Sequence, residues 1–143
     1  MTTFLKNRDM KFSFHLLLAC IALTACGESG KTTADYRIVP CPGEIAPGDG
    51  GDFELDARTR IVCTGDNDGM RANAEFLAGY VESVVGSAPE ITGPDGLCDD
   101  GRAVILRADA PGKGGEAYEI EVSENRITVS GESDAGVFYG IQT

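Results

Sequence analysis

The chain has 143 residues, a length typical of one folded domain, and its formal net charge at pH 7 is −11. An acidic chain without a cluster of Lys and Arg lacks the phosphate contacts that nucleic-acid binding requires, so nucleic acid is excluded as a partner. The only histidine is His15 and no Cys-x-x-Cys pair occurs. The composition therefore gives no support for a metal site, a cofactor or a Cys/His nucleophile.

The first segment has the three parts of an export signal. "MKFSFHLLLACIALTAC" begins at Met10 with a basic Lys11, continues as an apolar run from Phe12 to Ala22, and ends in small residues before Cys26. The "LTAC" at its end resembles a bacterial lipobox, in which the bond before the cysteine is cut and the thiol is lipidated. An ordinary secretory signal with an incidental cysteine is the alternative.

We therefore expect residues 1–25 to be a lipoprotein signal peptide, with Met10 as an alternative start. Lipidation at Cys26 predicts an exported bacterial lipoprotein, periplasmic or on the cell surface, that is held on the membrane without a spanning helix. Residues 26–35 are small and polar, which is typical of a flexible tether.

Three cysteines follow the tether, an odd number for an oxidising compartment. They are Cys41, Cys63 and Cys98. One disulfide with one free thiol and three free thiols both remain open, and the sequence does not choose a pair.

The first part of the expected domain, residues 36–143, begins with short strands. Residues 36–39 predict a strand that ends at Pro40, because proline has no amide donor for a sheet. After a turn-rich loop, alternation over residues 53–63 predicts two short strands or one bent pair around Asp56.

The next segment is the clearest helix in the sequence. Asp66, Asn67 and Asp68 offer side-chain oxygens for its N-cap, and Gly86 supplies its C-terminal stop. The spacing predicts one apolar stripe that packs on a sheet and is widened by two aromatic residues; its members are Met70, Ala74, Leu77, Val81 and Val84, with Phe76 and Tyr80 beside them.

Three further strands and a second helix complete the pattern. Residues 103–106 form an uninterrupted apolar run typical of a buried strand, and alternation over 118–122 and 126–130 predicts an antiparallel hairpin. Ser133 or Asp134 caps a helix that reaches the last residue. The fold class is α+β: a mostly antiparallel sheet with helices on one face, a two-layer sandwich whose second helix is incomplete.

None of the polar motifs predicts a reaction. Asp99 and Asp100 lie in a Gly-rich loop, and Glu119 and Glu121 lie on an expected solvent-exposed strand face; neither placement suggests the burial or charged neighbour that a general acid needs. "GKGG" lacks the following helix and Ser or Thr of a phosphate loop, and "TGDNDG" lacks the spacing and final Glu of a calcium loop. We therefore expect no catalytic and no metal-binding residue, and no substrate-binding residue is identified.

Beyond these patterns, the chain resembles a known module. The segments that show the resemblance are "RIVPCPGEIAPGDGGDFELDARTRIVC", the "AEFLAGYVESVVG" helix, "AVILRAD" and "EAYEIEVSENRITVSGESDAGVFYGIQT". In this order they resemble the non-catalytic N-terminal domain of bacterial β-N-acetylhexosaminidases of glycoside hydrolase family 20. The final "GVFYGIQT" is the most specific piece, and structurally similar domains also precede family 84 and α-glucuronidase barrels.

The resemblance implies that catalysis belongs to a domain other than this one. In that family a separate (β/α)8 barrel removes terminal N-acetylhexosamine from glycans, using the acetamido group of the substrate as nucleophile and an Asp-Glu pair of the barrel. The chain would then be a glycosidase fragment, inactive alone, with its own missing C-terminal catalytic barrel as partner. The alternative is a stand-alone surface lipoprotein that binds glycans or a partner, although no Trp is present and most tyrosines are expected in the core.

Overall fold

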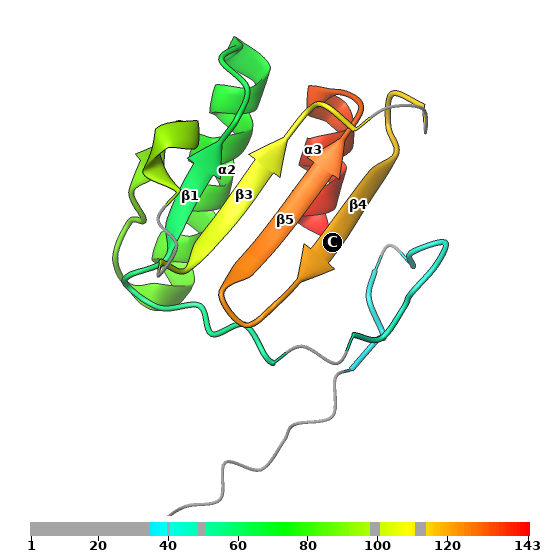
Figure 1. The fold of residues 1–143 in the computed structure, drawn as a ribbon, viewed down its shortest axis with the longest axis horizontal. Coiled ribbons are helices and arrows are strands. Elements are labelled where there is room, and N and C mark those ends of the chain that lie inside the picture. Colours follow the sequence, from blue (N-terminus) through cyan, green and yellow to red (C-terminus); the bar gives the residue numbers. More distant parts are fainter. Residues whose placement is uncertain (1–34, 40, 49–50, 98–100, 111–113) are drawn as a thin grey trace, which may run out of the picture. The chain divides into compact units, whose positions relative to one another are not determined.

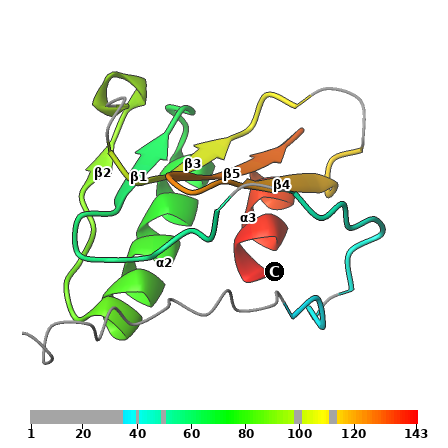
Figure 2. The same cartoon turned by 60° about the horizontal axis from the view of Figure 1, so that its bottom comes forward.

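The computed structural model describes residues 35–39, 41–48, 51–97, 101–110 and 114–143. Within Tyr36–Thr143, five strands form one sheet, with the order β2-β1-β3-β5-β4. The strands are β1 (Arg60–Cys63), β2 (Ile91–Thr92), β3 (Ala103–Arg107), β4 (Tyr118–Val122) and β5 (Arg126–Gly131). Two helices, α2 (Asp68–Val85) and α3 (Asp134–Gln142), lie on the same side of the sheet (Figures 1 and 2). The expected α+β class with helices on one face is therefore confirmed.

The direction of the strands differs from the expectation of a mostly antiparallel sheet. β1 pairs with β2, β1 with β3 and β3 with β5 in parallel, and only β4 pairs antiparallel, with β5. The reason is that α2 carries the chain back along the sheet before β2 begins, which makes the following strand parallel. The alternation of apolar and polar residues shows which side chains share a face of the sheet. It is the same in parallel and antiparallel strands, so it does not reveal their direction.

The helix-covered face holds the main core. Residues at alternate strand positions pack against the buried stripe of α2 and against α3; they are Ile61, Val104, Leu106 and Val129 from the strands, with Met70, Ala74, Ala78 and Val137 from the helices. The opposite face of β1 and β3 is also covered, because Val62, Ala103 and Ile105 are buried with Leu97 packed against them. Burial on both faces explains why Ala103–Leu106 has no polar residue.

Both helices begin, and α2 ends, where the sequence predicts. The Asn67 side chain accepts a hydrogen bond from the amide of Met70 at 2.8 Å, and Gly86 ends α2 with φ of 85°. That left-handed conformation favours glycine because it has no Cβ. Ser133 caps α3 by accepting from the amide of Gly136. The predicted hairpin of β4 and β5 is also confirmed.

Several local expectations are wrong. Residues 36–39 and 53–55 form no strand, and the short strand β2 was not expected. Neither of the first two segments has a partner strand in the sheet, and local alternation cannot supply one. Val84 belongs to the predicted buried stripe but is exposed, as are Phe76 and Tyr80 beside it. Tyr36, Tyr80 and Tyr139 are likewise exposed rather than in the core.

Candidate functional site

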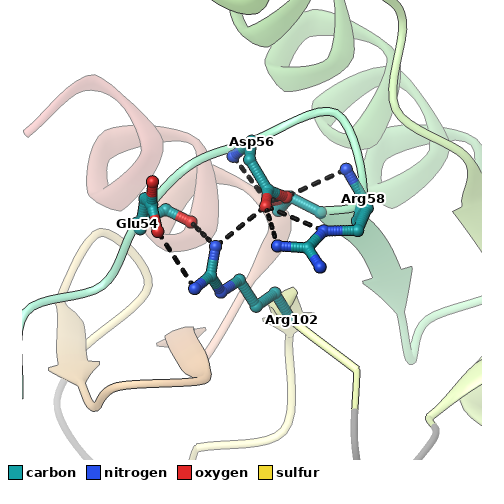
Figure 3. Close-up of polar contacts among 5 residues, drawn as sticks. Glu54, Asp56, Arg58 and Arg102 are labelled. Atoms are coloured by element: carbon teal, nitrogen blue, oxygen red, sulfur yellow. Dashed lines mark hydrogen bonds and ion pairs between the residues drawn. The ribbon is translucent and has the colours of Figure 1, made fainter. Parts of the chain in front are cut away.

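Charged side chains from two distant segments meet at the start of β3. The turn at residues 54–58 precedes β1, and Arg102 stands directly before β3. Arg102 donates to the Asp56 carboxylate at 2.8 Å and lies 3.1 Å from the Glu54 carboxylate (Figure 3). Arg58 contacts the same Asp56 carboxylate through its Nε at 3.0 Å and its Nη2 at 2.7 Å. We call these four residues the Asp56 cluster.

Hydrogen bonds of the backbone and of the Thr59 side chain fix the turn that carries Asp56. The amide of Asp56 donates to Oγ1 of Thr59, and the amide of Thr59 donates back to the carbonyl of Asp56. Thr59 is buried, so this tight turn is fixed where the chain enters β1. The amide of Arg60 in turn donates to the carbonyl of Arg102 at 3.0 Å. The cluster therefore joins the segment before β1 to the start of β3.

The electrostatics of the cluster keep Asp56 ionised. Hydrogen bonds from the Arg58 side chain and backbone hold the pKa of Asp56 below its ordinary value, and the charges of Arg58 and Arg102 act in the same direction. The reciprocal hydrogen bond raises the pKa of Arg58. A general acid needs a raised pKa so that it still carries its proton near neutral pH. Asp56 has the opposite shift, so the cluster acts as an anchor between two segments and has no proton to give.

A second arginine–aspartate pair lies at the other end of β3. Arg107 donates to both carboxylate oxygens of Asp109, at 3.0 and 2.9 Å. The hydrogen bond from Arg107 holds the pKa of Asp109 below its ordinary value. Both groups are largely exposed, and exposed pairs contribute little to stability. This pair also has the geometry of a surface contact and not of a reactive site.

The carboxylates that the sequence raised as candidates do not converge. Glu119 and Glu121 are exposed on β4, and Asp66 and Asp68 pair with Arg71 at the start of α2. Asp99 and Asp100 lie outside the described residues. Among the residues that the structure does describe, no group of three or more His, Cys, Asp or Glu side chains is arranged to hold a metal ion.

Two of the cysteines lie among the described residues and two of those discussed above lie outside them. Cys41 and Cys63 are free thiols, and the Sγ of Cys63 points at the carbonyl of Gly65 at 3.3 Å. Cys98 and the predicted lipidation site Cys26 lie outside the described residues. In the described part of the chain, neither helix combines the length and apolarity that crossing a membrane requires.

Sequence reasoning missed the role of the Asp56 cluster. The sequence pattern predicts only a break between two strands around Asp56, and it assigns no role to Arg102, the residue before the apolar run 103–106. The available signal was a charged residue directly beside a strand that is buried on both faces. A charge beside a buried strand needs an oppositely charged partner. Asp56, in the turn before β1, supplies that carboxylate.

Taken together, the fold and the cluster define a small α+β domain in which ion pairs join distant segments of the chain. The family model of glycosyl hydrolase family 20, domain 2, matches residues 35–143. The chain belongs to this family and corresponds to its domain 2. The match decides for family 20 over the similar domains of other glycosidases.

A solved family 20 enzyme has the same fold. The structure of the family 20 β-N-acetylhexosaminidase from Streptomyces coelicolor A3(2) is similar with a TM-score of 0.65 and 24% sequence identity, over 77% of this chain. This chain spans only 21% of that protein. A family 138 enzyme that targets the pectin rhamnogalacturonan II gives a TM-score of 0.41 at 22% identity, over 58% of this chain and 9% of that one. No curated protein matches the chain.

Proposed function

We propose that this domain serves a membrane-anchored β-N-acetylhexosaminidase that removes terminal N-acetylhexosamine residues from glycans. The family 20 match over residues 35–143 is the observation that carries the proposal. The hydrolysis belongs to a catalytic barrel that follows the domain, and that barrel is the partner of the domain. The domain itself contributes a rigid sheet and two helices beside the barrel.

The charges of the domain fit this division. Asp56 is held in its ionised form by two guanidinium groups, and Glu119 and Glu121 stand exposed on an edge strand. Asp56, whose pKa is lowered, is not suited to protonate a glycosidic oxygen, because that task needs a carboxyl group with a raised pKa. The chemistry is therefore expected from residues outside this sequence.

The anchoring part of the proposal rests on the sequence. The signal at Met10 and the "LTAC" ending at Cys26 support export and lipidation. A diacylated Cys26 would hold the enzyme at a membrane surface on the periplasmic or outer side. Residues 27–35 would then separate the lipid from the folded domain.

A hydrolysis assay tests the proposed function. The purified 143-residue chain should release only background product from a chromogenic N-acetylglucosaminide, while the full-length protein encoded by the gene should cleave it. A chromogenic glucoside without the acetamido group is the matched control, and the full-length protein should leave it intact. Turnover by the 143-residue chain, or an inactive full-length protein, would contradict the proposal.

A further inference from the structure

The two edges of the sheet differ in how they are protected. At one edge, β2 is a strand of two residues, Ile91–Thr92, and it lies between Pro89 and Pro94. Short edge strands and prolines are common means by which proteins keep further strands from pairing. At the other edge, β4 runs for five residues, Tyr118–Val122, and contains no proline (Figure 1). The edge formed by β4 is therefore the one that offers a full length of backbone to another strand.

The hydrogen bonds of the β4–β5 hairpin show which backbone groups of β4 point outward. The amide of Ser123 donates to the carbonyl of Arg126 at 2.8 Å, and the amide of Arg126 donates back to the carbonyl of Ser123 at 3.4 Å. Hydrogen-bonded and non-hydrogen-bonded positions alternate along an antiparallel pair. In the register of this hairpin, Glu121 therefore bonds to β5, whereas Ile120 and Val122 do not. The amides and carbonyls of these two residues point away from the sheet.

The outward groups are open to a partner. Among the described residues, no loop or turn makes a backbone hydrogen bond to Ile120 or Val122. The Ile120 side chain packs against the core under the helices, and Val122 lies on the same side of the strand but is 58% exposed. An added strand would bond to the free backbone groups and would also cover the Val122 side chain.

The charges along β4 determine which strand fits there. Residues 116–124 contain neither lysine nor arginine, and their four glutamates, Glu116, Glu119, Glu121 and Glu124, are all exposed. Glu119 and Glu121 lie on the face of the sheet opposite the helices, because Ile120 between them faces the core. Side chains of opposite charge on neighbouring strands stabilise the pairing, and like charges destabilise it. An added strand with basic residues at alternate positions would match these two glutamates.

A second copy of this chain does not match the same edge. If two β4 strands paired antiparallel about Ile120, Glu119 would lie opposite Glu121 of the second copy. Such like charges directly opposite each other destabilise a strand pair. The glutamates therefore disfavour self-pairing and favour a cationic strand.

We propose that the outer edge of β4 binds an extended peptide segment of another protein, in which basic and apolar residues alternate, as an added antiparallel strand. The apolar side chains of the segment lie beside Ile120 and Val122 on the helix side, and its basic side chains lie beside Glu119 and Glu121 on the opposite face. Backbone hydrogen bonds supply the affinity, and the alternation supplies the specificity. The antiparallel direction is the more stable one per residue.

Fluorescence anisotropy with a labelled synthetic peptide tests this inference. The probe is a short peptide in which lysine alternates with valine, and it should bind the purified 143-residue chain. A matched peptide with glutamate in place of lysine should bind several-fold more weakly, because its charges would lie beside Glu119 and Glu121.

Two N-methylated forms of the lysine–valine peptide separate strand addition from general attraction to an acidic protein. In an antiparallel pair, the valines opposite Ile120 and Val122 turn their amides towards β4, and the lysine amides point away. Methylation of the valine amides should therefore abolish binding, whereas methylation of the lysine amides should preserve it. Both forms carry the same charge.

Hydrogen exchange and substitution locate the contact. The amides of Ile120 and Val122 should exchange rapidly in the free chain and several-fold more slowly with the lysine–valine peptide. The amide of Glu121, which already bonds to β5, should change little. Glu121→Lys should weaken binding several-fold, and Glu75→Lys, the same change of charge at an exposed position of α2, should leave binding nearly unchanged.

Three results would overturn the inference. The first is a lysine–valine peptide that does not bind. The second is equal binding of the two N-methylated forms, which would indicate attraction by net charge alone. The third is slow exchange of the Ile120 and Val122 amides without peptide, together with a dimer mass in light scattering, which would assign the edge to a second copy. Glycan hydrolysis enters none of these measurements, so this inference and the proposed function fail independently.

Discussion

The carboxylate of Asp56 accepts hydrogen bonds from two arginines that belong to different segments of the chain. Arg58 is its neighbour in the turn, while Arg102 comes from the residue before β3. Neutralising Asp56 would remove one charged partner of Arg102 and leave Glu54 as its remaining contact in the turn. We therefore expect the Asp56 carboxylate to make a pH-dependent contribution to the free energy of unfolding.

We predict that Asp56→Asn destabilises the domain at neutral pH and that the difference disappears in acid. The hydrogen bonds from Arg58 lower the pKa of Asp56 in the folded state below the ordinary 3.8. A lowered folded-state pKa gives stability that is complete above the unfolded-state value and is lost as pH falls through the folded-state value. Urea unfolding should therefore separate the two proteins at pH 7 and bring them together at a pH well below 3.8.

The control for this prediction is Glu116→Gln, at an exposed carboxylate outside the cluster. It removes one negative charge as Asp56→Asn does, and it should leave stability at pH 7 unchanged. A midpoint difference for Asp56→Asn that persists unaltered in strong acid would show that the substitution acts through packing and not through the charge.

At the scale of elements, helix α3 packs closely on the hairpin because it carries small residues there. A Cβ placed on Gly140 would stand 2.5 Å from Cγ1 of Val129 and 3.3 Å from the Tyr118 ring, too close for either neighbour. Gly79, on α2, has no atom within 4 Å of its Cβ position. Close packing therefore requires glycine at Gly140, whereas the open site at Gly79 does not.

The same substitution at these two positions should have opposite effects. Gly140→Ala should lower the free energy of unfolding by ~1–3 kcal/mol, because it overpacks the contact between α3 and β5. Gly79→Ala should raise it by ~0.5–1 kcal/mol, since alanine favours the helix at an open site. Chemical denaturation of both variants in one series measures the pair, and a stabilised Gly140→Ala would refute the close packing of α3.

The elements also show how far sequence reasoning reaches. The caps of α2 and α3 and the β4–β5 hairpin depend on residues close together in the chain, so local patterns predicted them. The parallel pairing of β1 with β3 joins distant residues, and alternation carries no information about it. Val84 has the right spacing for a core position but is exposed, because burial depends on which distant segments pack beside α2. The Asp56 cluster was missed for the same reason, since its two halves lie far apart in sequence.

At the scale of the whole molecule, the lipid anchor is the part that the sequence alone predicts. Cys26→Ala should abolish labelling by a radioactive fatty acid and release the protein from the membrane fraction, because only the thiol at the cleavage site accepts the lipid. Cys20→Ala, within the apolar run of the signal, is the matched control and should keep both properties. Unchanged membrane partition of Cys26→Ala would contradict the lipobox interpretation.

The place of β5 in the sheet has a consequence for synthesis on the ribosome. β5 lies between β3 and β4, although it follows both of them in the sequence. When β1, α2 and β3 have emerged from the exit tunnel, β3 still presents an unpaired edge, and that edge is filled only after Gly131 has been translated. Nascent chains stalled before this residue should therefore be digested readily by protease and should expose a strand edge that chaperones can bind.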